Sequence, residues 1–356
     1  MRLLTTRVIA CLIVAPLVAH APAGIARAGG GHASLDRVRL AADIGRIAAA
    51  ARPGVLGVGV AVLGTNERWL LERDRPLPMQ SVFKAPLGAA VLDAVDRGRL
   101  RLDSTVVLRA SDLSVPYSPV AAAYPSRTRW TLEELLTRAV ETSDNTAADV
   151  LMRLIGGPAA LTSWLRTRGI EGIEVDRYER VQQPEILGLG RFQPSWVNQD
   201  SLDRAKLAVP EPARRAAMMA YLRGRRDTIT PRGAVAFLAA LQAGRLVSKP
   251  STTRLLHMMT EAVTGPHRLR AGLPNGATLA HKTGTGPTVL GVCTATNDIG
   301  IATLPDGRRV AIAVLLSGST ADEAARDATL AAVARAAMAA LPVARATGRS
   351  RGGRQT

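Results

Sequence analysis

A serine and a lysine three positions apart are the residues whose types and spacing most directly suggest chemistry. Ser81 and Lys84 open the run 81–100, which is largely apolar after Lys84 and predicts a buried helix. At this spacing the two side chains lie on one face of a helix. A serine hydroxyl becomes nucleophilic when a base takes its proton, and a buried lysine near positive charge can be that base. The pair predicts nucleophilic catalysis, although it also arises by chance about once in a chain of this length.

Two further polar clusters follow in the sequence. Ser143-Asp144-Asn145 lies between two predicted helices, where such a triplet is commonly only a helix cap. Lys282-Thr283-Gly284-Thr285 lies on a predicted strand, and Gly284 has no side chain to block the close approach of a ligand. Lysine is scarce in this arginine-rich chain, so three such clusters in this order are poorly explained by chance. We interpret them as parts of one site.

The elements that must position these residues form an α/β pattern. Strands are predicted near both ends of the chain, at 55–63, 68–71, 279–283, 298–304 and 309–316, with helices at 36–51 and 321–341. The middle is mainly helical, at 131–142, 147–155, 158–168, 233–243 and 252–264, and 131–142 opens with the capping box Thr131-Leu-Glu-Glu134. We therefore expect one antiparallel sheet flanked by helices, with an all-α lobe inserted. The α/β lobe would comprise 29–80 and 227–342, and the helical lobe 81–226.

Composition and the chain ends narrow the function classes. The formal charge is +17, but the arginines are dispersed and aromatic residues make up only 3%, so we expect no nucleic-acid partner. Residues 1–28 resemble a secretory signal, which predicts a periplasmic or secreted protein without a stable membrane anchor; residues 343–356 read as a basic disordered tail. Removal of the signal leaves Cys293 as the only thiol, and the histidines show no metal-ligand spacing. We expect a monomer with no metal and no cofactor.

Taken together, the motifs make the chain resemble a class A serine β-lactamase. Ser-x-x-Lys, S-D-N and K-T-G in this order are a motif set of class A β-lactamases and penicillin-binding proteins. The resemblance covers nearly the whole mature sequence, including the segments Tyr117-Ser-Pro-Val120, Asp176-Arg-Tyr-Glu179, Arg226-Asp-Thr-Ile-Thr-Pro231, Thr264-Gly-Pro-His-Arg-Leu269 and Asn297-Asp-Ile-Gly-Ile301. It implies the β-lactamase/transpeptidase-like fold and a small β-lactam substrate, and it would associate the protein with antibiotic resistance.

The resemblance also implies roles for individual residues. Ser81 would form an acyl-enzyme, with its N–H and that of Thr285 as the oxyanion hole. Lys84 and Glu179 are both candidate bases for acylation, and Glu179 would activate the water for deacylation. The remaining expected roles are proton relay to the lactam nitrogen by Ser143, substrate-amide binding by Asn145, carboxylate binding by Lys282, Thr283, Thr285 and Arg268, close substrate approach at Gly284, an aromatic rim at Tyr117, and an ion pair of Arg177 with Asp227 closing the Ω loop. For Tyr117 simple packing is an equal alternative, and Arg268 could be one more surface arginine.

The chain departs from the family pattern around the Ω loop, expected at about 176–227. This loop is much longer than the family normally has, and within it only 213–223 looks helical. Arg180 and Gln183 stand where many members carry proline and asparagine, so acylation is better supported than fast deacylation. We expect the extra residues, about 184–222, to reshape the rim of the pocket. Glu185 or Glu211 could replace Glu179 as the base, but neither has the matching context.

Two other functions remain open at this stage. A D,D-peptidase or related esterase would share the serine, lysine, S-D-N and K-T-G motifs but would lack the loop glutamate. A slowly deacylating sensor of β-lactams or peptidoglycan would be acylated and stay acylated.

Overall fold

The computed structural model describes residues 34–342. The predicted signal at 1–28 and the predicted tail at 343–356 lie outside this range. Within it, no helix is both long enough and apolar enough to cross a membrane.

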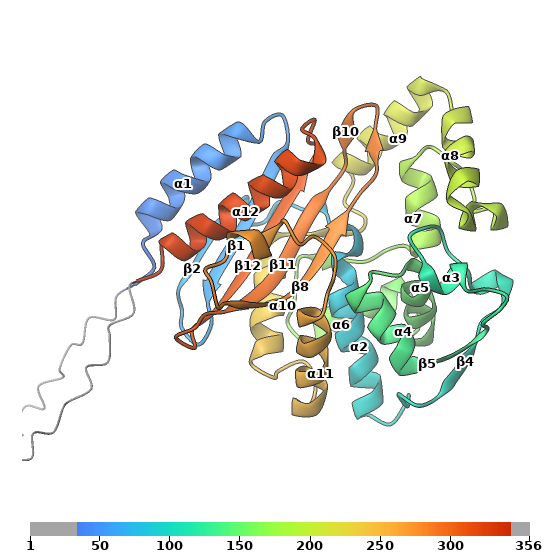
Figure 1. Cartoon of the computed structure of the whole chain (residues 1–356), viewed down its shortest axis with the longest axis horizontal. Helices are drawn as coiled ribbons and strands as arrows, with labels where there is room; N and C mark the ends of the chain where they lie inside the picture. The colour runs from blue at the N-terminus through green and yellow to red at the C-terminus, as the bar shows by residue number, and fades with distance from the viewer. Residues whose placement is uncertain (1–33, 343–356) are drawn as a thin grey trace, which may run out of the picture. The chain divides into compact units, whose positions relative to one another are not determined.

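A five-stranded antiparallel sheet forms the β part of the fold (Figure 1). Its strand order is β2–β1–β12–β11–β8, so strands from both ends of the chain are neighbours. The strands are β1 (Val55–Val62), β2 (Arg68–Leu71), β8 (Thr278–Thr285), β11 (Thr296–Thr303) and β12 (Arg309–Ser317). Strand β8 carries the K-T-G residues and lies at one edge of the sheet. The antiparallel sheet with flanking helices confirms the predicted α/β class.

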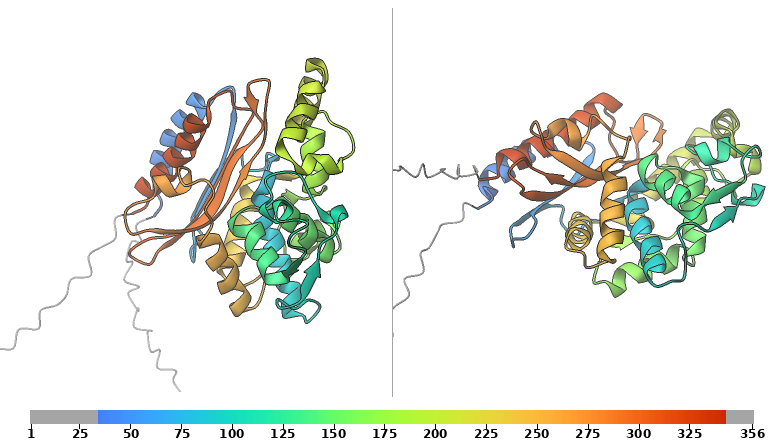
Figure 2. Two further views of the ribbon diagram at one scale, coloured as in Figure 1. Left: turned by 45° about the vertical axis from the view of Figure 1, so that its right-hand side comes forward. Right: turned by 60° about the horizontal axis from the view of Figure 1, so that its bottom comes forward.

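The alternation of residues along β1 explains how helices cover both faces of the sheet. Leu56, Val58 and Val60 belong to the core beneath α1 (Arg37–Ala50) and α12 (Glu323–Ala339), which lie side by side in Figures 1 and 2. The residues between them are small and face α10 (Pro231–Gln242). A Cβ added to Gly59 would lie 2.5 Å from Val235 Cγ2 of α10. The small residues therefore allow a helix to pack closely against this face.

The remaining helices lie beyond the β8 side of the sheet, with α2 (Lys84–Asp96) at their centre (Figure 2). Helix α2 is buried along nearly its whole length and packs among the other members of one large apolar core. The surrounding helices are α3 (Pro119–Ala122), α4 (Leu132–Glu141), α5 (Asn145–Leu154), α6 (Pro158–Thr167) and α11 (Lys249–Thr260). The Thr131–Glu134 capping box is present at the start of α4.

Short strands form further small sheets outside the five-stranded sheet. Strands β3, β7 and β6 form a small sheet, β4 pairs with β5, and β9 pairs with β10. Their bounds are β3 (Leu77–Pro78), β4 (Thr105–Val107), β5 (Arg129–Thr131), β6 (Ile173–Glu174), β7 (Thr228–Ile229), β9 (Thr288–Val289) and β10 (Val292–Cys293). The 3₁₀ helices are η1 (Gln80–Phe83), η2 (Ala110–Asp112), η3 (Pro194–Val197) and η4 (Leu269–Gly272).

The expected long loop is largely helical. It contains α7 (Glu179–Ile186), α8 (Gln199–Ala208) and α9 (Glu211–Arg223), of which only the last was predicted from the sequence. An apolar cluster joins this segment to Val115 and Val289, and its other buried members are Leu187, Leu202 and Met218. Phe192 and Trp196 pack edge to face at 6.3 Å. We call residues 184–222 the inserted segment.

Candidate active site

Ser81 lies in the short helix η1, immediately before α2 begins at Lys84. The Ser81 side chain is half-buried, whereas Lys84 is completely buried. Lys84 Nζ lies 2.9 Å from Ser81 Oγ. The run that was predicted as one helix therefore starts as a tighter 3₁₀ turn, which keeps Ser81 at the surface end of a buried helix.

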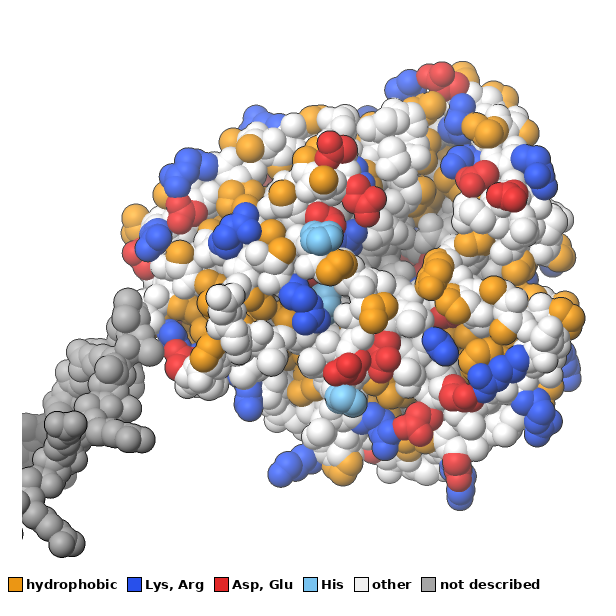
Figure 3. Space-filling model, viewed as in Figure 1, with side chains coloured by type: hydrophobic (Ala, Val, Ile, Leu, Met, Phe, Trp, Pro, Cys, Tyr) orange, Lys and Arg blue, Asp and Glu red, His pale blue; other side chains and the backbone are white. Residues whose placement is uncertain are grey.

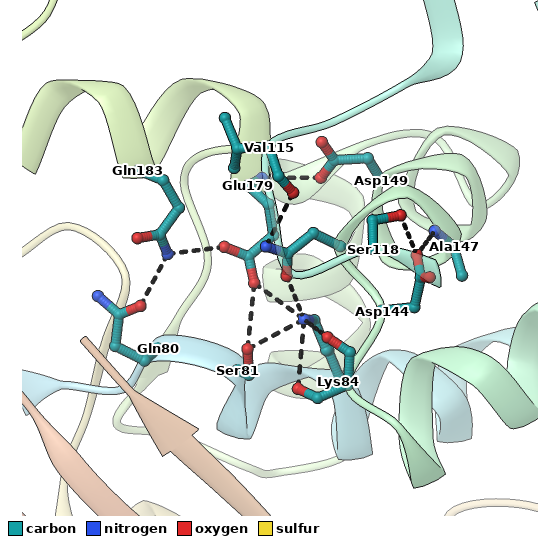
Figure 4. Close-up of polar contacts among 12 residues, drawn as sticks. Gln80, Ser81, Lys84, Val115, Ser118, Asp144, Ala147, Asp149, Glu179 and Gln183 are labelled. Carbon is teal, nitrogen blue, oxygen red and sulfur yellow. Dashed lines mark hydrogen bonds and ion pairs between the residues drawn. The ribbon is translucent and has the colours of Figure 1, made fainter. Parts of the chain in front are cut away.

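Lys84 also reaches the S-D-N segment between α4 and α5 (Figure 4). Its Nζ donates to the Ser143 carbonyl oxygen at 2.7 Å and to Asn145 Oδ1 at 2.6 Å. The Asn145 amide nitrogen donates to the carbonyl of Pro116 at 3.0 Å, which orients the amide oxygen towards Lys84. Ser143 has a positive φ of 62°. This turn places the carbonyl and hydroxyl of Ser143 next to the lysine.

Asp144 is the N-cap of α5, as a simple cap interpretation of the triplet predicts. Its carboxylate accepts from the N–H of Ala147 at 2.8 Å and also from the N–H of Val120 at 2.7 Å. Burial raises the pKa of Asp144, and these hydrogen bonds oppose that shift. The same carboxylate therefore holds the loop that carries Tyr117, whose side chain is 63% exposed.

Glu179 is the first residue of α7, and its side chain is fully buried. Its Oε1 lies 3.3 Å from Ser81 Oγ and 3.1 Å from Lys84 Nζ. Asp149 of α5 accepts hydrogen bonds from the N–H groups of Glu179 (2.7 Å) and Arg180 (3.0 Å). These are the otherwise unpaired donors at the start of α7. Asp149 thus fixes the end of the helix that presents Glu179.

Burial, and then the negative charge of Glu179, raise the pKa of Asp149 to about 7. Sequence analysis missed this residue. Its position four residues after Asn145 places both on one face of α5, and that spacing could have indicated it.

Gln183 lies one helical turn after Glu179. Its Nε2 donates to Glu179 Oε2 at 2.8 Å, so the glutamine reaches the carboxylate despite its additional methylene relative to asparagine. The two alternative bases have other partners: the Glu185 carboxylate pairs with Arg177 and Arg226, and that of Glu211 pairs with Arg215.

Lys282 approaches the same site from strand β8. Its Nζ lies 3.0 Å from Ser143 Oγ and 3.1 Å from the Thr283 carbonyl oxygen. Complete burial, and then the positive charge of Lys84, hold the pKa of Lys282 well below its usual range. The space-filling view shows the surface hollowed between the sheet and the α7–α9 segment (Figure 3).

Gly284 is where β8 packs against the chain that leads to Ser81. A Cβ added there would collide with the Met79 carbonyl oxygen and lie 3.1 Å from the Val82 backbone nitrogen. The glycine therefore allows two protein backbones to approach each other, and the ligand approach expected from the sequence stays a prediction. Asn297 of β11 reinforces this junction by donating to the Met79 carbonyl at 3.1 Å.

Arg268 is only 4% exposed and is not a free surface arginine. Its guanidinium pairs with Asp327 at 2.8 Å and donates to Thr285 Oγ1 at 2.9 Å. Thr285 is itself exposed, whereas Thr283 is buried and hydrogen-bonds to Thr264 at 2.6 Å. Arg268 thus adds positive charge directly behind the exposed hydroxyl of β8.

The two ends of the long segment are joined by the Arg177–Asp227 ion pair, with Nε and Oδ2 2.5 Å apart. Asp227 also accepts from the backbone N–H groups of Asp176 and Arg177.

Within residues 34–342, no group of three or more histidine, cysteine or acidic side chains is placed to hold a metal ion.

Comparison with known proteins identifies the family. The model of the β-lactamase enzyme family matches residues 39–341. The extended-spectrum β-lactamase PER-1 of Pseudomonas aeruginosa is 34% identical, over 79% of this chain and 81% of that protein. A solved β-lactamase of Chitinophaga pinensis is 33% identical with a TM-score of 0.68, over 83% of this chain and 97% of the other. An ancestral class A β-lactamase is 34% identical with a TM-score of 0.68, over 85% and 100%. These matches show that the chain belongs to the β-lactamase enzyme family and is a class A β-lactamase.

Proposed function

We propose that this enzyme hydrolyses the β-lactam amide through an acyl-enzyme on Ser81, and that Glu179 activates the water that releases it. The observation that carries the proposal is the position of Ser81 Oγ, 2.9 Å from Lys84 Nζ and 3.3 Å from Glu179 Oε1. A nucleophile within reach of two proton-transfer groups is the arrangement that covalent catalysis requires.

The acceptors around Lys84 favour Glu179 as the base for acylation too. Three of them can only accept: the Ser143 carbonyl, Asn145 Oδ1 and the Glu179 carboxylate. These three acceptors favour the charged ammonium form of Lys84, which has no lone pair to take the Ser81 proton. Glu179 has acceptor capacity directed at Ser81. Lys84 would then supply positive charge and pass a proton to Ser143, whose hydroxyl lies 3.4 Å away.

The K-T-G strand supports recognition of an anionic substrate. Lys282, Thr285 and Arg268 place two cations and a hydroxyl at the edge strand. These donors suit a substrate carboxylate. The backbone N–H groups of Ser81 and of Thr285, on the edge strand β8, would provide the oxyanion donors.

A time course of intact protein mass tests the proposal, with a penicillin and a cephalosporin as substrates. We expect wild type to show a transient adduct and Glu179→Ala to accumulate it. Glu211→Ala is the matched control, because that carboxylate pairs with Arg215 on the surface and should leave turnover unchanged. Equal loss of the adduct from wild type and Glu179→Ala would exclude Glu179 as the deacylating base. A wild-type adduct that persists without turnover would indicate a sensor.

The inserted segment would shape the rim of the same pocket. Its apolar cluster includes Val115, which precedes the loop carrying Tyr117, and Val289, which follows the K-T-G strand. The segment thus packs against two parts of the chain that border the site. Excision of residues 184–222 should change the relative kcat/KM values of penicillins and cephalosporins; identical values for every β-lactam tested would reject this role.

A further inference from the structure

One residue of the inserted segment reaches the chain beside the nucleophile. Most of α9 is solvent-accessible, and its only two buried residues are Met218 and Tyr221. The Tyr221 oxygen lies 2.6 Å from Gln80 Nε2. Gln80 directly precedes Ser81, is completely buried and has a positive φ of 49°. A non-glycine residue keeps such a backbone conformation only where its surroundings hold it.

Hydrogen bonds continue from Gln80 to the proposed base. Gln183 Nε2 donates to Gln80 Oε1 and to Glu179 Oε2, both at 2.8 Å, as Figure 4 shows. Tyr221, Gln80, Gln183 and Glu179 therefore form a continuous chain of contacts. It starts in the inserted segment and ends on the carboxylate oxygen that does not face Ser81.

The carboxylate determines the direction of every donor in this chain. An ionised glutamate can only accept, so the Gln183 amide must present its NH₂ group to Glu179. The second N–H of that group then requires the Gln80 carbonyl oxygen, and the Gln80 NH₂ group points to Tyr221. An acceptor at position 221 is consequently needed to satisfy a fully buried amide.

We propose that Tyr221 is a positioning residue for Glu179 and acts through Gln80 and Gln183. This role rests on the proposed function of Glu179 in deacylation. Loss of the Tyr221 oxygen leaves the Gln80 amide without an acceptor, so that amide can rotate and release Gln183. The Oε2 side of Glu179 then loses its fixed orientation, while Oε1 retains its contacts with Ser81 and Lys84. Deacylation should therefore suffer more than acylation.

The surroundings of Tyr221 explain why its hydroxyl is held in place. The Arg177 guanidinium lies 5.9 Å from the centre of the tyrosine ring, and the same arginine pairs with Asp227 and Glu185. The ring is thus packed next to the ion pairs that join the ends of the long segment. Burial raises the pKa of Tyr221, which keeps the phenol neutral and able to accept from Gln80.

Single-turnover kinetics of Tyr221→Phe test this role, because the substitution removes one oxygen and keeps the ring. We expect the deacylation rate constant to fall about tenfold, in keeping with the sensitivity of catalysis to sub-ångström placement, with a much smaller change in acylation. Gln80→Leu should show the same selective loss. Met218→Leu is the control, since it alters a buried neighbour in α9 without entering the chain of hydrogen bonds, and it should leave both rate constants unchanged.

A double-mutant cycle separates positioning from general stabilisation. If Tyr221 acts through Gln80, Tyr221→Phe should have no further effect on deacylation in the Gln80→Leu background. The proposal would be overturned if the losses in deacylation rate caused by Tyr221→Phe and Gln80→Leu multiply in the double variant. It would also be overturned if Tyr221→Phe slows acylation and deacylation equally, or if folded Tyr221→Phe deacylates at the wild-type rate. Glu179→Ala is measured in parallel: if it traps the adduct while Tyr221→Phe matches wild type, only the role of Tyr221 fails. If Glu179→Ala does not trap the adduct, the proposed function itself fails.

Discussion

Lys84 Nζ and Glu179 Oε1 form an ion pair at 3.1 Å in which both side chains are completely buried. Two charges in such a place depend on each other, because neither can be solvated by water once its partner is removed. The pair also brings together the start of α2 and the start of α7. Its geometry therefore couples the stability of the helical part of the fold to the proposed chemistry.

Lys84→Met should remove activity and destabilise the protein together. The substitution leaves the Glu179 carboxylate buried without its cation, for which we expect a loss of about 3–5 kcal/mol in the free energy of unfolding. Chemical denaturation and adduct formation measure the two effects. Lys206→Met is the control, since Lys206 and Asp203 form a partly exposed pair whose loss should cost at most about 1 kcal/mol. Equal stability of the two variants would contradict this account.

Gly284→Ala should slow acylation although it adds only one methyl group. The new Cβ would collide with the Met79 carbonyl, so β8 must move away from the segment that carries Ser81. We expect acylation by a penicillin to fall at least about tenfold, because the proposed oxyanion donors, the N–H groups of Ser81 and Thr285, would separate. The matched control is Gly45→Ala in α1, where a Cβ meets no atom within 4 Å. Acylation at the wild-type rate would show that the strand tolerates the methyl group.

The pH dependence of KM should report Lys282. Because its pKa is held well below the usual lysine range, Lys282 loses its charge at a lower pH than an exposed lysine does. In the proposed binding mode a substrate carboxylate pairs with the charged form, so KM should rise as pH increases through that pKa. Lys282→Arg keeps the charge and should flatten this rise. The exposed Lys249 serves as control through Lys249→Arg, and a wild-type KM that does not vary with pH would refute the prediction.

Asp149 should make stability fall as pH rises. Its pKa is about 7 in the folded protein, whereas the ordinary value for an aspartate is 3.8, so between these values the folded state binds more protons than the unfolded state. The free energy of unfolding therefore decreases from about pH 4 to about pH 7, by at most about 4 kcal/mol from this group. Asp149→Asn removes that contribution to the slope, and denaturant titrations at several pH values measure it. Asp200→Asn, on the exposed face of α8, should keep the wild-type slope. If Asp149→Asn also keeps the wild-type slope, Asp149 is not the group that causes it.

The helices of this protein differ in how clearly the sequence predicts them. The α/β class is confirmed, and α4 follows its capping box because the Thr131 and Glu134 side chains satisfy the first backbone donors within one turn. Helix α9 was predicted at 213–223, whereas α8 was missed because it buries a single side chain, Leu202. A helix with so little buried surface leaves a weak apolar period in its sequence.

The sequence by itself determined which residue types could do the chemistry, because serine, lysine and glutamate carry their reactivity with them and motif order needs no coordinates. It also indicated that Ser81 and Lys84 lie on one face, because residues three apart are neighbours on a helix, although the turn at Ser81 is a 3₁₀ helix and not the expected α-helix. Only the tertiary structure decided that Asp149 caps α7, that Arg268 is buried against Asp327, and that Tyr221 contacts Gln80. Those contacts join residues from different elements, and their formation depends on how the helices and the sheet pack rather than on any local pattern.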